Sequence, residues 1–234
     1  MLCACGGGDP APVVDAIGEP LGHTTHATWQ VQNLDGSNAG CPAGFDQAAV
    51  VSWRSDQVGL CGPGAAPSDT CHVSYFACDA GQGTTAPLPA GTYITTVGIT
   101  SHDHAQLYAQ SLPAVLDLGT DQATAATIYN DAGYFSATWT LVGRTSGATL
   151  ACDAAGATQV SVVTTRNGAA SHDKFPCAAG HGFTMPLRAG AYTFGASAID
   201  DTGAARGAAT VLTSSIQAKN AVTELGALVL EVDD

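Results

Sequence analysis

The chain repeats itself, and this internal repetition constrains the fold more than any other feature of its 234 residues. Three pairs of segments match in the same order: 26–31 with 136–141, 75–83 with 174–182, and 87–93 with 186–192. The last two pairs align without a gap and share cysteine, proline, glycine and tyrosine residues. We interpret the pattern as a tandem duplication. It predicts two domains, residues 21–130 and 131–234, after an N-terminal tether of residues 1–20.

The segments within each repeat are typical of short β-strands. They alternate around Trp29 and Trp139 or are rich in β-branched residues, and Gly, Pro and Asp turns separate them. Only 12% of the residues are charged, which disfavours long solvated helices. Because strands and turns alternate through about 100 residues in each repeat, we predict an all-β chain of two tandem Ig-like β-sandwiches.

The sequence Pro-Leu-x-Ala-Gly-x-Tyr occurs in each repeat, at 87–93 and at 186–192. It resembles the start of a hairpin in prealbumin-like modules, which are also called carboxypeptidase-regulatory-like modules. The resemblance implies a β-sandwich in which this turn leads into a strand whose first tyrosine covers one end of the sandwich. That tyrosine would be Tyr93 in the first repeat and Tyr192 in the second.

Eight cysteines indicate disulfides, because their number is even and none has the spacing of a zinc site. Disulfides in turn indicate an oxidising, extracytoplasmic compartment. The repeat alignment makes Cys41 and Cys78 equivalent to Cys152 and Cys177, and an insertion in the first repeat carries Cys61 and Cys71. We therefore predict three disulfides: Cys41–Cys78, Cys61–Cys71 and Cys152–Cys177.

The first residues resemble a bacterial lipobox. The run Leu2-Cys3-Ala4-Cys5 precedes a Gly- and Pro-containing stretch of the kind that tethers a lipoprotein. The resemblance implies that Cys5 is lipidated, and that a lipidated N-terminus provides the membrane contact. The charged and apolar regions that precede a lipobox are not in this sequence. The alternative is that Cys3 and Cys5 are ordinary thiols of a frayed end.

The chain is strongly acidic, with 7 Lys and Arg residues against 20 Asp and Glu residues and a formal charge of −13. Such a field repels phosphate backbones, so we expect no nucleic-acid partner. Residues 1–130 hold eleven acids and one base, whereas residues 131–234 hold nine acids and six bases. The uneven distribution of charge is consistent with different specialised surfaces on the two repeats or with contact between them. It is equally consistent with sequence drift constrained only by solubility.

Histidines are the candidate metal ligands. Five of the seven lie in the first repeat, and four of them form the candidate set: His23, His26, His102 and His104. On a strand, His102 and His104 would face the same side, as two ligands of zinc or copper require. The other two would join them only if the first strand passed nearby. The alternative is a polar loop whose histidines are solvated or hydrogen-bonded to Asp side chains.

Aromatic residues divide into core and surface candidates. Trp29 and Trp139 occupy equivalent positions, which indicates core packing. Trp53 aligns with Val163 or its neighbour, so we expect it in the core as well. Tyr108 has no counterpart in the second repeat, and we expect it to be an exposed contact for a carbohydrate or a partner.

No catalytic residue is assigned, because the hydrolase and phosphate-binding motifs G-x-S-x-G, H-E-x-x-H and G-x-x-x-x-G-K do not occur. Asp35 and the pair Asp200–Asp201 lie in oxygen-rich segments that calcium could use, but Asp-Gly sequences favour turns. We therefore predict a non-catalytic binding or structural module of the cell envelope, either an outer-membrane lipoprotein or secreted. It would have no cofactor, and its partner would be an envelope protein or a glycan. A zinc- or copper-binding envelope protein is the alternative.

Overall fold

A computed structural model of the chain describes residues 22–56, 61–62 and 70–234. The tether of residues 1–20, with the predicted lipidation site Cys5, and most of the insertion between Arg54 and Cys71 lie outside the described residues. The regular secondary structure of the described residues is β-strand apart from two short 3-10 turns, so the predicted all-β class is confirmed. No helix among the described residues has the length and apolar character needed to cross a membrane.

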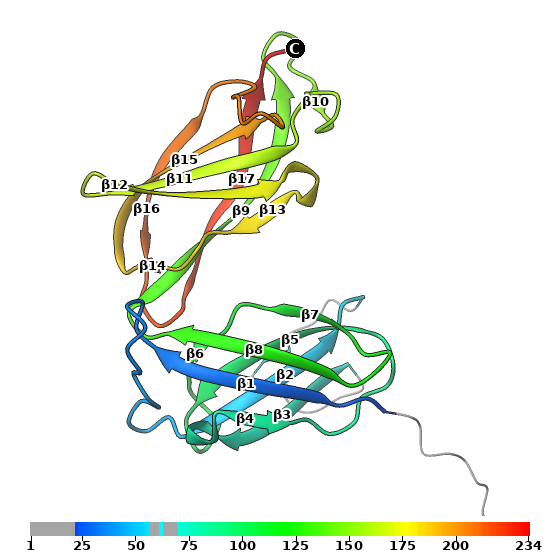
Figure 1. Ribbon diagram of the computed structural model, residues 1–234, viewed down its shortest axis with the longest axis vertical. Coiled ribbons are helices and arrows are strands. Elements are labelled where there is room, and N and C mark those ends of the chain that lie inside the picture. Colours follow the sequence, from blue (N-terminus) through cyan, green and yellow to red (C-terminus); the bar gives the residue numbers. More distant parts are fainter. Residues whose placement is uncertain (1–21, 57–60, 63–69) are drawn as a thin grey trace, which may run out of the picture.

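The first sandwich consists of a three-stranded and a larger sheet (Figure 1). The three-stranded sheet has the order β4 (Gln82–Thr84), β1 (Thr25–Gln32), β8 (Gln122–Tyr129), and β8 runs parallel to β1. The larger sheet has the order β3 (Cys71–Ala77), β2 (Gln47–Arg54), β5 (Thr92–Thr100), β6 (Leu107–Gln110), and β7 (Ala114–Asp117) also pairs with β5.

The second sandwich has the same strand order and the same directions. Its sheet with the parallel pair contains β13 (His181–Phe183), β9 (Ala132–Gly143) and β17 (Val222–Val232), with β10 (Thr149–Leu150) and β14 (Leu187–Arg188) also bonded to β9. The other sheet has the order β12 (Ala169–Pro176), β11 (Gln159–Arg166), β15 (Gly190–Ile199), β16 (Thr210–Ile216). The strand β1 therefore corresponds to β9, and β8 to β17.

The equivalent tryptophans have the same burial and the same hydrogen bond in both sandwiches. Trp29 and Trp139 are each 6% exposed, because their strands alternate between core and solvent. The indole N–H of Trp29 donates to the carbonyl oxygen of Cys78 at 2.8 Å, and that of Trp139 donates to the carbonyl oxygen of Cys177 at 2.9 Å. Both acceptors begin 3-10 turns, η1 (Cys78–Ala80) and η2 (Cys177–Ala179). Both tryptophans are core residues, as the repeat alignment predicts.

Disulfides join the cysteine pairs that the repeat alignment predicts. Cys41–Cys78 and Cys152–Cys177 attach each 3-10 turn to the segment that follows the first strand of its sandwich, with Cα–Cα distances of 6.1 and 6.0 Å. Cys61–Cys71, with a Cα–Cα distance of 5.5 Å, ties the insertion to the start of β3. Because two of these bonds occupy equivalent positions, the same staple stabilises each sandwich.

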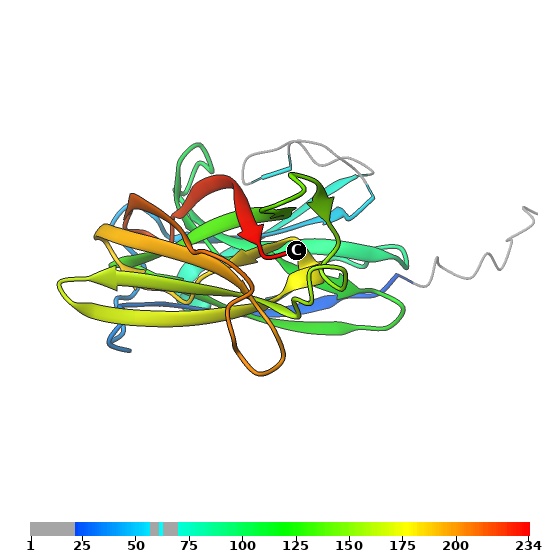
Figure 2. The same cartoon turned by 90° about the horizontal axis from the view of Figure 1, so that it is seen from above.

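The second sandwich lies above the first along the long axis of the molecule (Figure 1). Seen down that axis, it overlies the first sandwich (Figure 2). The strand β8 ends at Tyr129 and β9 begins at Ala132, so Asn130 and Asp131 alone connect them along the chain. Such a short connection brings the loops of both sandwiches together at the junction.

Candidate binding cleft between the sandwiches

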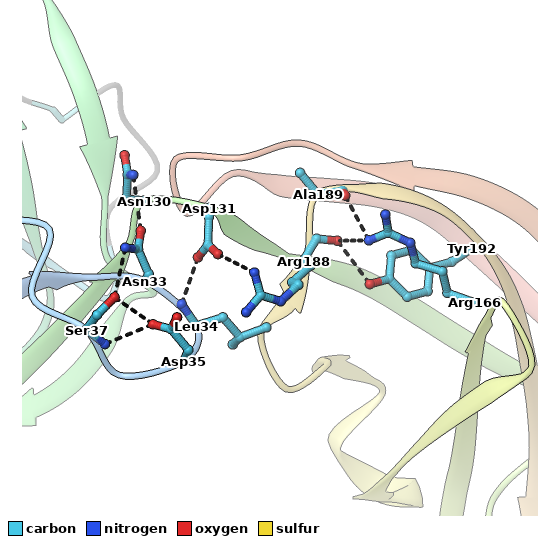
Figure 3. Close-up of polar contacts among 10 residues, drawn as sticks. All are labelled: Asn33, Leu34, Asp35, Ser37, Asn130, Asp131, Arg166, Arg188, Ala189 and Tyr192. Carbon is cyan, nitrogen blue, oxygen red and sulfur yellow. Dashed lines mark hydrogen bonds and ion pairs between the residues drawn. The ribbon is translucent and has the colours of Figure 1, made fainter.

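Asp131 joins the two sandwiches through both of its carboxylate oxygens (Figure 3). Its Oδ1 accepts a hydrogen bond from the backbone N–H of Leu34, which follows β1, at 2.7 Å. Its Oδ2 accepts one from the guanidinium group of Arg188, on β14, at 2.9 Å. The Arg188 side chain is 54% exposed, so the ion pair fixes an orientation more than it adds stability.

A chain of amide and hydroxyl groups continues from the junction into the loop after β1 (Figure 3). The Asn130 amide donates to Oδ1 of Asn33 at 3.2 Å, and the Asn33 amide donates to Oγ of Ser37 at 3.0 Å. The hydroxyl of Ser37 donates to Oδ1 of Asp35 at 2.6 Å. Hydrogen bonds from the side chain and backbone of Ser37 lower the pKa of Asp35. Asp35 thus stabilises a turn, in agreement with the Asp-Gly signal.

Asn220, in the turn between β16 and β17, bonds to both sandwiches. It is 2% exposed, its amide donates to the carbonyl oxygen of Gln110 at 2.7 Å, and its Oδ1 accepts from the backbone N–H of Tyr129 at 2.9 Å. Its own N–H donates to the carbonyl oxygen of Ala132 at 2.8 Å. Its φ of 56° lies in the left-handed region, which asparagine tolerates better than most residues. A buried side chain whose Nδ2 and Oδ1 are both hydrogen-bonded holds the turn in one position.

Tyr108 lies at this junction, so the expectation of an exposed side chain is wrong. It is half-buried, and its hydroxyl group donates to Oδ1 of Asn130. The ammonium group of Lys219 lies 4.8 Å from the centroid of its ring, a cation–π contact across the two sandwiches. Burial raises the pKa of Tyr108, so its hydroxyl stays protonated and remains a donor at neutral pH.

The expectation that Trp53 belongs to the core of the first sandwich is also wrong. Gln47 and Gln159 hold the same place in their sheets, which makes Trp53 equivalent to Thr165 instead of Val163. Both Val163 and Thr165 lie on the outer face of β11, and the Trp53 side chain likewise points away from the core of its own sandwich. It is half-buried and packs against the outer residues of β2 and the Cys61–Cys71 disulfide.

A cleft with a volume of about 550 Å³ lies between the outer face of the β2–β5–β6 sheet and the base of the second sandwich. This volume is within the range of small-molecule sites, about 300–1,000 Å³. The first sandwich contributes Trp53, Ile94, Thr96, Leu107, Tyr108, Ala109, Gln110, Ser111 and Pro113, and the second contributes Phe183, Lys219, Asn220, Ala221, Val222 and Glu224. Sequence reasoning missed the cleft because its two walls meet only in the folded chain.

The four candidate metal ligands do not come together. His23 and His26 lie at the beginning of β1, where His23 bridges to Leu88 and Nδ1 of His26 is 3.2 Å from Oγ1 of Thr84. His102 and His104 follow the end of β5, which pairs with the beginning of β2. The beginning of β2 follows the end of β1 along the chain, so His102 and His104 lie at the end of the sandwich where β1 ends. His23 and His26 lie where β1 begins, at the opposite end.

The segment that carries His102 and His104 is a turn and not a strand. Nδ1 of His102 lies 3.2 Å from Oδ2 of Asp46, whereas the ring of His104 stacks on Tyr75 with 3.6 Å between centroids. Asp103 closes the turn by accepting a hydrogen bond from Ser101, which lowers the pKa of its carboxyl. In residues 22–56, 61–62 and 70–234 no group of three or more His, Cys, Asp and Glu side chains could hold a metal ion.

No model of a protein family and no curated protein matches the sequence. The chain is similar in structure to a leucine-rich repeat protein from Bacteroides thetaiotaomicron, with a TM-score of 0.40 and 10% identity over 92% of this chain and 27% of that one. It is also similar to a minor pilin from Streptococcus agalactiae, with a TM-score of 0.30 and 11% identity over 91% and 97% of the two chains. A putative adhesin from Bacteroides ovatus gives a TM-score of 0.30 and 10% identity over 100% and 98%. The chain spans less than two thirds of the first three structures matched, covering 27%, 34% and 62% of them.

Proposed function

We propose that the chain is a non-catalytic binding or structural module of the cell envelope or the extracellular space. The observation that carries the proposal is the bonded junction, which joins two disulfide-stapled sandwiches into one elongated unit. A module of this kind can hold a binding surface at a fixed distance and orientation. The disulfides support an oxidising compartment, because cytosolic reductants keep thiols free.

Thiol trapping in the organism that encodes the chain tests the compartment. Cells are lysed under denaturing conditions with a maleimide-coupled polyethylene glycol, with and without prior reduction. We expect the six paired cysteines to react only after reduction. Reaction of all six without reduction would place the chain in a reducing compartment and contradict the proposal.

We further propose that Cys5 carries a lipid, which would make the protein an outer-membrane lipoprotein. This proposal rests on the resemblance of residues 2–5 to a lipobox. The gene, with its natural upstream sequence, is expressed in cells fed an alkyne-tagged fatty acid. We expect label in the wild type and in Cys3→Ser, and none in Cys5→Ser; equal labelling of the two variants would contradict it.

A further inference from the structure

We propose that the cleft between the two sandwiches binds a neutral oligosaccharide, with sugar rings packed against Trp53 and Phe183. The inference deepens the proposed binding role by naming a site and a ligand class. The cleft proposal does not depend on the cellular compartment or on lipidation of Cys5. An experiment that contradicts it therefore leaves those two proposals standing, and the reverse also holds.

The walls of the cleft are held in place before a ligand arrives. Asn220 is buried and bonded to Gln110 of the first sandwich, and Lys219 rests on the ring of Tyr108. A site whose walls are already fixed does not lose conformational entropy on binding, which favours affinity. The preformed volume of about 550 Å³ admits a ligand larger than a single small metabolite.

Apolar groups from both sandwiches face the cleft. Trp53 and Ile94 pair across β2 and β5 on the outer face of the first sandwich, and Phe183 and Val222 come from the second. Leu107 and Val222, at 48% and 38% exposed, are two of the six exposed large apolar residues of the described chain. Aromatic rings combine a large apolar face with a rigid shape, and the C–H face of a sugar ring packs well against such a face.

Hydrogen-bonding groups lie among these apolar side chains. The Gln110 amide donates to Oγ1 of Thr96 at 2.8 Å, and Oε2 of Glu224 accepts from the Ser136 hydroxyl at 2.6 Å. These contacts use one atom of each side chain, and among the described residues the side-chain oxygen Oε1 of Gln110 and Oε1 of Glu224 have no hydrogen-bond partner. A hydroxyl-rich ligand supplies donors to both oxygens, whereas a purely apolar ligand would remove water from them without replacing the hydrogen bonds.

Charge favours a neutral ligand. The first 130 residues carry eleven acids and one base, so their field repels anionic polymers. The residues that line the cleft include one carboxylate, Glu224, and one ammonium group, Lys219, which lies against the ring of Tyr108. The two charges sum to zero, so the lining has no net charge that would select an ionic ligand over an uncharged saccharide.

Tryptophan fluorescence provides a direct test. Trp53 lines the cleft, whereas Trp29 and Trp139 are buried in the two cores. The full chain is titrated with neutral gluco-, manno- and chito-oligosaccharides of increasing length. We expect a saturable fluorescence change with at least one series, and its loss in Trp53→Phe. If none of the three series changes the fluorescence or gives heat in calorimetry, the proposal is wrong.

Two arginine substitutions with the same change in charge locate the site. Val222→Arg fills the cleft and should raise Kd by about tenfold or more in calorimetry. Val115→Arg, at a position on β7 that is 70% exposed and outside the cleft, should leave Kd unchanged. Equal effects of the two variants, tighter binding of anionic than of neutral saccharides, or displacement of the saccharide by an unrelated extended peptide would each overturn the assignment.

Discussion

The two sandwiches share a scaffold and differ at the surface that faces the cleft. Strand order, the buried tryptophan and the disulfide at the 3-10 turn are the same in both. The cleft residues of the first sandwich differ from the residues at the equivalent positions of the second. For example, Trp53 corresponds to Thr165. The connection from β2 to β3 spans sixteen residues, whereas the hairpin from β11 to β12 has two, Asn167 and Gly168.

This difference separates the residues that stabilise the fold from those available for function. A residue type that occurs at equivalent positions of both sandwiches is explained by packing, because both cores need it. A residue type that occurs in only one of the two sandwiches is not required by the shared core. The cleft takes its lining from the outer face of the first sandwich and, in the second, from Phe183 on β13, the turn before β17 and the start of β17.

Removing the shared disulfides should have the largest effect. In the chain-entropy model, loss of Cys41–Cys78 costs about 4 kcal/mol and loss of Cys152–Cys177 about 3.5 kcal/mol, since they close loops of 37 and 25 residues. Urea denaturation of the paired Cys→Ala variants measures both. Loss of Cys61–Cys71, which closes 10 residues, should cost less, about 2.5–3 kcal/mol. If one shared pair proved dispensable, the two scaffolds would not be equivalent.

Asn220→Gly should destabilise the chain by about 2 kcal/mol, because glycine keeps the left-handed backbone but removes both side-chain hydrogen bonds. Asn167→Gly is the matched control. Asn167 has a φ of 51° in an exposed hairpin, so its replacement should change the free energy of unfolding little. Similar losses in the two variants would mean that the Asn220 side chain does not lock the junction.

Asp173→Asn should stabilise the second sandwich at neutral pH, because the ionised carboxyl is buried and its Oδ2 has no hydrogen-bond partner among the described residues. Burial raises the pKa of Asp173 above its ordinary value of 3.8, so the folded state favours the protonated form. The stabilisation from this group is complete below the unfolded-state pKa and is lost as the pH rises through the folded-state pKa. Chemical denaturation of wild type and variant across acidic and neutral pH measures the difference. The first sandwich has Ser74 at the same register position and should show no such dependence.

Asp200→Asn provides a control of opposite sign. Hydrogen bonds, first from the Thr202 side chain, lower the pKa of this exposed carboxyl, so its contribution is present above the unfolded-state pKa and is lost as the pH falls. Its removal should reduce stability at neutral pH. Equal signs for the two variants would contradict the assigned environments.

Arg188→Ala should have the smallest effect on stability, about 0.5 kcal/mol, because the ion pair with Asp131 is solvent-exposed. Lys174→Ala, on an exposed position of β12, is the control. Thermal denaturation at low and high salt separates the two, since only the Arg188 contribution should fall with added salt. A loss above about 2 kcal/mol would assign the junction's stability to charge instead of to Asn220.

Sequence reasoning succeeded where the repeat supplied a second copy to compare. The shared cysteine pairs and the core role of Trp29 and Trp139 follow from aligned positions, and the structure shows both. The all-β class, which follows from the strand and turn patterns and the low charge, is also confirmed. Local signals such as Asp35 before Gly36 also predicted turns correctly, because turn formation depends on neighbouring residues alone.

The cleft was beyond sequence reasoning because it depends on how the two sandwiches meet. Asn220 looks like any polar turn residue, and only the fold reveals that Gln110 and Tyr129 surround it. Trp53 was expected in the core because its aligned partner Val163 is apolar, but Val163 and the actual counterpart Thr165 both lie on the outer face of β11. The histidine set failed to converge because spacing along a chain does not say at which end of a sandwich a segment lies.

Residual dipolar couplings of the full chain in a weakly aligned medium test most directly whether the two sandwiches form one fixed unit. The account predicts that a single alignment tensor fits the backbone N–H vectors of both sandwiches, and that Asn220→Gly reduces the agreement. Two tensors of clearly different magnitude in the wild-type chain would show that the sandwiches reorient independently. That result would contradict both the locked junction and the preformed cleft.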